Sequence, residues 1–261
     1  MYYYILDPPR SREEQKTIDD LRAKLTNLGI AGEFVTASPN RSIEEIAEIG
    51  VAKRYTTLVA IGSEKLINTV GLLLAGTPYT FGALPLENFS SLSLISNINN
   101  IDEAAEALKY RRLKFVPVTK IEPNKFFFTE IFNDFSHAVK IRLLIDDAMV
   151  EADVTQIRIA GNGRIVLKKT FEKSAGISRS LSWITGRKET VSEISTFQAK
   201  AYRLEAPIGA ALKQGQLEFT HIPFSATVIP KSLKVIVKRD RLAPSQFETS
   251  TGGINSRQQE S

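Results

Sequence analysis

The sequence predicts a fold of the α/β plus all-β class, in which an open α/β domain is followed by an antiparallel β-sandwich. Residues 1–115 alternate strand-like with helix-like hydrophobic patterns, whereas residues 116–242 are almost entirely strand-like. The chain has 261 residues, which is enough for two hydrophobic cores. Residues 243–261 are rich in Ser, Gln, Thr and Gly, so we expect this tail to be disordered.

The first half predicts strands and helices in strict alternation. Asp7-Pro8-Pro9 stops the first strand, and Ser42 with Glu45 forms a capping-box pattern that opens the second helix. This order predicts a mostly parallel sheet, whose ligands bind at the carboxyl ends of the strands. The expected strands are residues 2–6, 33–37, 57–61 and 79–84, and the expected helices are residues 13–28, 42–52, 66–74 and 102–112.

The second half predicts an antiparallel domain. Residues 199–204 alternate polar with apolar side chains, which is typical of a strand with one wet face. Residues 136–144 are the one segment that favours a helix. The expected strands are residues 116–121, 125–131, 156–159, 164–170, 195–204, 216–221 and 232–237.

Composition excludes several kinds of site. The chain has no cysteine, and its two histidines, His137 and His221, lie far apart in sequence, so neither is given a metal role. The N-terminus lacks the basic flank of a signal peptide, and no stretch approaches the roughly 20 apolar residues of a membrane span. We therefore expect a cytoplasmic protein, either free or peripheral to the membrane.

The formal charge of +5 is unevenly distributed. Residues 1–115 carry 13 Lys/Arg and 14 Asp/Glu, a net charge of −1, while residues 116–261 carry 21 and 15, a net charge of +6. A basic second half suits an anionic membrane surface or lipid, or a phosphorylated ligand, and a merely solubilising surface is the open alternative. We expect no nucleic acid partner, because the basic residues are scattered and no aromatic-basic RNA signature occurs. A homo-oligomer is left open.

Three turns follow strands of the first domain at residues 7–12, 61–70 and 81–90. Only Gly62 offers the bare backbone that a phosphate cradle needs, and composition alone describes ordinary strand-to-helix turns. In their order, however, the turns resemble the catalytic domain of diacylglycerol kinases and their bacterial lipid-kinase and sphingosine-kinase relatives. That family has Gly-Gly-Asp-Gly-Thr in the central turn, commonly followed by Ile-Asn-Glu-Val. Gly62, Ile67, Asn68 and Val70 match this pattern in register.

The second domain resembles the same family near its end. Family members have an alternating strand, a short Asp-Gly-Glu turn, a further strand and a Pro-x-Ala-Leu-x-Val-x-Val ending. This chain has residues 199–207, then Gln214-Gly215-Gln216, then residues 229–237. The resemblance covers about residues 2–240, with a looser match from about 138 to 195.

The resemblance implies an ATP-binding domain, a lipid-binding β-sandwich and an active cleft between them, with ATP and Mg²⁺ as cofactors. It implies magnesium binding by Glu64. Nucleotide contacts would fall on Arg10, Gly62, Ser63, Glu64, Lys65, Asn68, Pro85 and Asn88.

The residues that would perform this chemistry are largely replaced. Ser63 and Lys65 stand where the family has glycine, and each adds a Cβ that obstructs close approach of the backbone to phosphate. The third turn lacks the family's Gly-Thr-x segment. Gln214 and Gln216 occupy both acidic positions of the turn whose Asp serves the family as general base. An amide cannot accept a proton near neutral pH, which removes a contribution of typically 10²–10⁴-fold.

Three hypotheses follow. The first is a catalytically impaired lipid-kinase homologue that binds nucleotide, lipid or both in the interdomain cleft. The second is an active but atypical ATP-dependent lipid kinase, in which Glu64 binds magnesium and Asp146, Asp147 or Glu218 replaces the base. The third is a partner-binding module in which the cleft is vestigial.

Overall fold

The computed structural model describes residues 1–38, 40–86, 95–173, 189–206 and 209–238. Asn88 and the tail at 243–261 lie outside these residues. The strands, all in one sheet, are β1 (Tyr2–Leu6), β2 (Gly32–Thr36), β3 (Thr57–Gly62), β4 (Thr80–Pro85), β5 (Arg112–Ile121), β6 (Lys125–Phe127), β7 (Glu130–Ile145), β8 (Ala148–Ala160), β9 (Arg164–Lys173), β10 (Glu189–Gln198), β11 (Ala201–Glu205), β12 (Ala211–Gln214), β13 (Leu217–His221) and β14 (Phe224–Val237). The helices are α1 (Arg12–Asn27), α2 (Ile43–Ala52), α3 (Glu64–Leu74) and α5 (Ile101–Tyr110).

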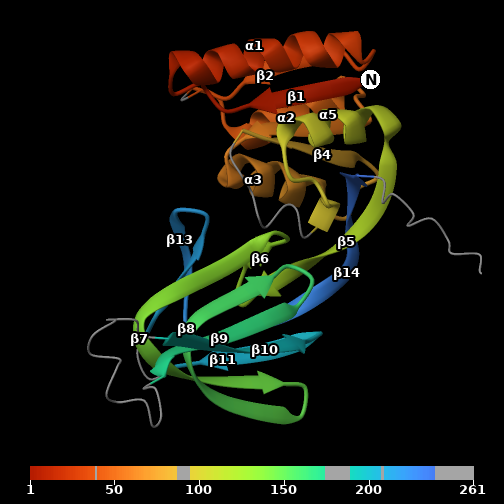
Figure 1. The fold of residues 1–261 in the computed structure, drawn as a ribbon. Helices are drawn as coiled ribbons and strands as arrows, with labels where there is room; N and C mark the ends of the chain where they lie inside the picture. Colours follow the sequence, from red (N-terminus) through yellow and green to blue (C-terminus); the bar gives the residue numbers. More distant parts are fainter. Residues whose placement is uncertain (39, 87–94, 174–188, 207–208, 239–261) are drawn as a thin grey trace, which may run out of the picture.

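The first domain is a three-layer α/β structure (Figure 1). Its parallel strands lie in the order β2-β1-β3-β4, and every residue of β1, β3 and β4 is buried. Side chains of α1 and α5 pack on one face of the sheet, and side chains of α2 and α3 pack on the other. The predicted capping box is present, since Ser42 and Glu45 exchange side-chain-to-backbone hydrogen bonds at the start of α2. The α/β part of the predicted fold class is confirmed.

The second domain is an antiparallel β structure with its own core. Its strands follow the order β10-β9-β8-β7-β11-β14, and β12 and β13 form a hairpin beside β7. The core is built from apolar side chains of these strands, among them Ile141, Ile157 and Leu204. The all-β part of the predicted fold class is therefore confirmed as well.

The helix expected at residues 136–144 is wrong, because β7 runs through this segment. Val139, Ile141 and Leu143 are buried while the residues between them are exposed, so the burial period is that of a strand. Antiparallel pairing with β8 fixes this register, and a bulge between Asp134 and Val139 accommodates Ser136 and His137 in exposed positions. Local helical preference is overridden by cross-strand pairing, with β8 on one side of β7 and with the more distant β11 on the other.

Two long strands cross from one domain to the other. β5 and β14 are antiparallel partners over most of their lengths, and the expected domain boundary at residue 115 lies inside β5. The first part of β14 pairs with β11, whereas Val235 near its end pairs with Phe81 of β4. The final strand of the second domain thus returns to the sheet of the first.

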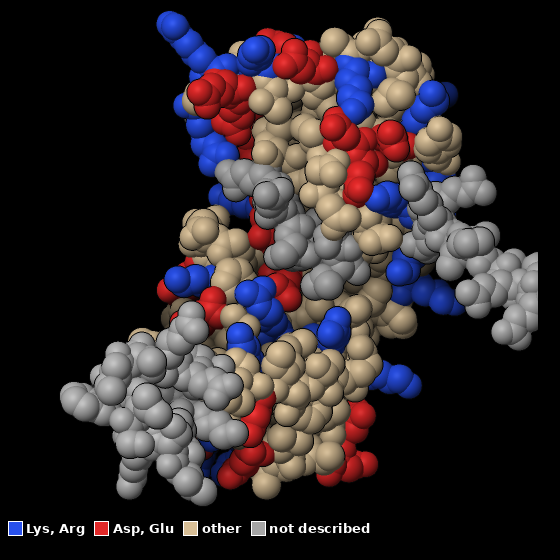
Figure 2. All heavy atoms as spheres, in the orientation of Figure 1, with Lys and Arg blue, Asp and Glu red and all other residues tan. Residues whose placement is uncertain are grey.

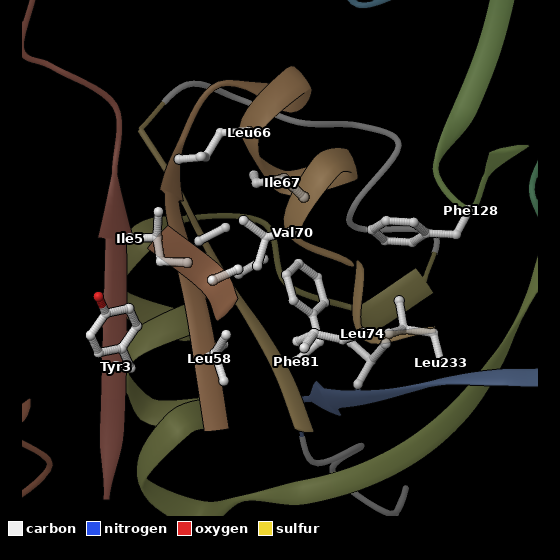
Figure 3. Packing of buried hydrophobic residues seen from close by; sticks show 14 of the residues in the cluster. Tyr3, Ile5, Leu58, Leu66, Ile67, Val70, Leu74, Phe81, Phe128 and Leu233 are labelled. Atoms are coloured by element: carbon white, nitrogen blue, oxygen red, sulfur yellow. The ribbon is translucent and has the colours of Figure 1, made fainter. Parts of the chain in front are cut away.

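An aromatic side chain of the second domain completes the core of the first. The Phe128 ring lies edge-on to Phe81, with ring centroids 5.7 Å apart and an interplanar angle of 82° (Figure 3). Gly71 of α3 has no side chain on this side, and a Cβ there would overlap the Phe128 ring. Leu233 of β14 packs in the same cluster. The two domains are therefore joined by a buried apolar contact immediately before Thr129 and β7.

Within the described part of the chain, no helix is both long enough and apolar enough to cross a membrane.

Candidate functional site

The central turn lies between β3 and α3, at the carboxyl edge of the parallel sheet. Gly62 ends β3 with φ +147°, and a Cβ on it would overlap the carboxylate of Asp7. Both features require glycine at this position. Ser63 then begins α3 as its N-cap, with its Oγ accepting a hydrogen bond from the Leu66 backbone N–H at 3.3 Å. The predicted turn residues Gly62 and Ser63 are therefore conformational determinants of this turn.

The carboxylate of Asp7 accepts a hydrogen bond from a backbone amide at the start of α3. The Ser63 backbone N–H donates to Asp7 Oδ2 at 2.6 Å, and the Asp7 backbone N–H donates to the Ile61 carbonyl at 3.1 Å. Backbone N–H groups at a helix N-terminus are the groups that bind a phosphate. In this protein, one of them is already satisfied by an anionic side chain of the same chain.

Glu64 faces the second domain. A Cβ built on Gly215 would lie 3.0 Å from Glu64 Oε2, so the bare backbone of Gly215 leaves room for this carboxylate. Gly215 has φ +59°, as the tight turn between β12 and β13 requires. Figure 1 shows the β13 hairpin extending from the second domain toward α3. The structure thus brings together Glu64 and the Gln214-Gly215-Gln216 turn, which are 150 residues apart in sequence.

Gln214 makes a structural hydrogen bond. Its Nε2 donates to Oγ1 of Thr129 at 2.9 Å, and Thr129 is buried. Thr129 directly follows Phe128, so this bond ties the hairpin to the domain junction. Gln216, at the other acidic position of the family pattern, is exposed.

The remaining residues that were predicted to contact a nucleotide lie in different surroundings. Asn68 is buried on α3, and its Oδ1 has no hydrogen-bond partner in the described structure. Lys65 is exposed, and Pro85 is buried opposite Gly62 in the β3–β4 pairing. Arg10 is an exposed residue whose guanidinium lies 3.2 Å from the Glu14 carboxylate. Lys65 and Asn68 thus lie in α3, Pro85 at the end of β4 and Arg10 just before α1.

Arg10 also affects the ionisation of its partner. Its backbone N–H donates to Glu14 Oε2 at 2.6 Å, and its guanidinium adds a charged hydrogen bond. These contacts hold the pKa of the Glu14 carboxyl below its usual range, with the backbone hydrogen bond as the larger cause.

The three acids considered as replacement bases lie in different places. Glu218 is on β13, close in sequence to the hairpin turn, and its Oε1 lies 3.1 Å from His221 Nε2. Asp146 and Asp147 form the turn between β7 and β8. That turn is at the opposite end of a sixteen-residue strand from Thr129 and Gln214. Glu218 is therefore the acid of this group that shares a hairpin with Gln214.

Two features of the site have no counterpart in the sequence prediction. The first is the Asp7–Ser63 hydrogen bond. The sequence pattern could have indicated it, because Asp7 directly follows β1, which lies beside the strand that Gly62 ends. The second is the Glu130–Arg158 ion pair beside Thr129, with a nitrogen–oxygen distance of 2.9 Å and Glu130 only 7% exposed. Its residues come from two paired strands whose register could not be read from the sequence.

Charge is mixed over the molecule. On the face drawn in Figure 2, Lys and Arg side chains are interspersed with Asp and Glu on both halves. Within the described ranges, no three His, Asp or Glu side chains lie close enough together to hold a metal ion. The magnesium role of Glu64 stays a prediction.

Comparison with known proteins returns structural matches alone. No family model matches the sequence, and no curated protein matches it. The matching solved structures include "A putative diacylglycerol kinase from Bacillus anthracis str. Sterne", with a TM-score of 0.65 and 13% identity, which covers 91% of this chain and 97% of that chain. A second structure described in the same way has a TM-score of 0.64 and 12% identity, with the same coverage. A third, of "a diacylglycerol kinases from Bacillus anthracis str. Sterne", has a TM-score of 0.62 and 14% identity, again with 91% and 97% coverage. The chain therefore has the two-domain fold of these proteins over nine-tenths of its length, and the likeness at this identity is one of fold.

Proposed function

We propose that this chain is a catalytically impaired lipid-kinase-like protein, which binds a lipid, a nucleotide or both between its domains without efficient phosphoryl transfer. The observation that carries the proposal is the hydrogen bond from the Ser63 N–H to the carboxylate of Asp7. It lies in the turn where the lipid-kinase resemblance requires the backbone to receive phosphate.

The start of α3 fits a triphosphate poorly. A phosphate at this turn would have to displace the Asp7 carboxylate from the Ser63 amide and would meet the negative charge of Glu64 nearby. Like charges at short range repel, and the repulsion is strong where solvent is partly excluded. Any nucleotide bound between the domains would have to place its phosphates elsewhere.

The residue at the position of the family's general base also supports impaired catalysis. A general base must accept the proton of the attacking hydroxyl, and the amide nitrogen of Gln214 instead donates to Thr129. Removing such a base typically costs 10²–10⁴-fold in rate. Phosphoryl transfer depends on positioning and charge neutralisation, and the Asp7 carboxylate disfavours both for a phosphate at this turn.

A second candidate is an active, atypical ATP-dependent lipid kinase. It is favoured by the approach of Glu64 Oε2 to Gly215, which places a carboxylate beside the turn that bears the family's base. In this case Glu64 would bind magnesium and Glu218, on the same hairpin, would act as the base.

A phosphorylation assay separates the two candidates. We expect little or no transfer from labelled ATP to a panel that includes diacylglycerol and sphingosine. Robust turnover that disappears in Glu64→Ala would overturn the impaired assignment and support the second candidate.

Ligand binding tests whether the interdomain site is retained or vestigial. A ligand at 100 times its dissociation constant stabilises the folded state by about 2.7 kcal/mol, which a thermal-shift assay with millimolar Mg-ATP would detect. Flotation with anionic and neutral liposomes, at low and high salt, tests the expected association with a membrane surface. A chain that responds to neither would act as the partner-binding module of the third hypothesis.

A further inference from the structure

A groove with a volume of about 730 Å³ lies at the end of α3 opposite to Glu64, where α3, the β5–β6 turn and β14 meet. Its walls are apolar and come from α3 with its C-cap, β5, β6 and β14: Leu72, Ala75, Val118, Phe126, Ile229 and Pro230. Its volume falls in the range of small-molecule sites, which are commonly found where domains meet.

The groove is shaped by a bulge in β14. Pairing with β5 shifts register between Ile229 and Leu233, and Lys231 within this segment has φ +50°. A left-handed backbone is unfavourable for a residue with a side chain and has to be stabilised by its surroundings. Ser232 provides this stabilisation, because its Oγ donates to the Ile229 carbonyl at 2.7 Å and its carbonyl accepts from the Gly76 N–H at 2.6 Å. The groove is therefore bounded by hydrogen-bonded backbone on the β14 side.

Lys231 and Asn124 also line this apolar groove, together with Ser232, whose hydroxyl already donates to the Ile229 carbonyl. Lys231 is exposed and has no ion-pair partner among the described residues. The side chain of Asn124 makes no hydrogen bond to a described residue. A lysine ammonium is a single positive charge, which balances one carboxylate, whereas a phosphate monoester carries a charge of about −1.5 to −2 near neutral pH. The chemistry that complements the groove is an apolar chain with one terminal carboxylate.

We propose that this groove binds a long-chain fatty acid, with its chain along the apolar walls and its carboxylate at Lys231 and Asn124. The site is separate from the phosphate turn, since the eleven residues of α3 place its two ends about 16 Å apart. The proposal therefore does not depend on whether the chain binds nucleotide or transfers phosphate.

The test is displacement of a fluorescent fatty acid, cis-parinaric acid, from the full chain by oleate below its micellar concentration. We expect oleate to displace the probe and oleyl alcohol, which has the same chain without the charge, to do so at least ten-fold less well. Lys231→Gln should weaken oleate about ten-fold and leave oleyl alcohol unchanged. Lys16→Gln, which removes an exposed charge from α1, is the matched control and should change neither.

A second pair of variants tests the walls. Ala75→Phe should fill the groove and abolish displacement by both ligands, and Ile229→Asp, at a residue 40% exposed, should weaken oleate by charge repulsion if Ala75→Phe does not fold. Circular dichroism confirms that each variant is folded. Absence of probe binding, equal binding of oleate and oleyl alcohol, or equal effects of Lys231→Gln and Lys16→Gln would each overturn the proposal.

Discussion

The start of α3 and the turn of the β12–β13 hairpin both depart from the lipid-kinase pattern, and they do so in opposite ways. At the start of α3 a charge is present where the resemblance requires free backbone donors, since Asp7 accepts from Ser63. At the hairpin a charge is absent where the resemblance requires one, since Gln214 donates to Thr129. In each region the altered side chain makes a hydrogen bond that supports the fold. The side chains of Asp7 and Gln214 are therefore part of the hydrogen-bonded structure and are not isolated changes at the surface.

The largest effect should come from the contact that holds the two regions in place. Phe128→Ala removes a fully buried ring that packs against Phe81 and Gly71, and should lower the free energy of unfolding by about 3–5 kcal/mol. Urea denaturation measures this loss. Phe115→Ala, at a residue 56% exposed, is the control and should cost less than about 1 kcal/mol. Similar losses for the two variants would show that the junction does not fix the domains.

The two turn glycines should differ in how well they tolerate a side chain. Gly62→Ala combines a positive φ with overlap of the Asp7 carboxylate and should cost about 2–4 kcal/mol. Gly215→Ala meets only the end of the Glu64 side chain, which can move, so its cost should be about 1 kcal/mol from backbone strain. Thermal or urea denaturation of the two variants checks the order. A reversed order would mean that Asp7 is not held against Gly62.

The hydrogen bond of the hairpin should have a smaller effect. Gln214→Leu leaves the buried Thr129 hydroxyl without this partner and should lower stability by about 1–2 kcal/mol. Gln216→Leu changes an exposed residue of the same turn and should be nearly neutral. Equal stability of the two variants would show that Gln214 has no structural role.

Removing the charge of Asp7 should change stability least and should change the binding of Mg-ATP. Asp7→Asn retains an oxygen that accepts from the Ser63 N–H but removes the charge, so it should cost about 1 kcal/mol. If that charge excludes phosphate, the variant should show a larger thermal shift with Mg-ATP than the natural sequence does. Asp20→Asn, on the exposed side of α1, should show no such gain. The absence of any gain in Asp7→Asn would remove the charge of Asp7 as the cause of impairment.

The sequence predicted those parts of the fold that are encoded by local pattern. The uniformly apolar segments became the buried strands β1, β3 and β4, and Ser42 with Glu45 formed the predicted cap. The β7 segment was mistaken for a helix because part of its strand pairing, with β11, is non-local. Phe128 and Thr129 could not be recognised for the same reason, since their partners lie on α3 and in the distant hairpin. Gly62 and Gln214 were identified from their positions in the motif. The contacts that each residue makes could be seen only in the structure.

Because β14 returns to the first domain, folding of that domain can be completed only late in synthesis. Leu233, Val235 and Val237 complete a core whose other members are mostly contributed by the first half of the sequence. A ribosome-bound chain would therefore have exposed the strand edges of β4 and β5 for most of its synthesis, until its last described residues emerged. Contacts between such distant residues also slow folding. The two domains are thus best regarded as one cooperative unit, in which neither the sheet of the first nor the junction between them is complete before the last strand is in place.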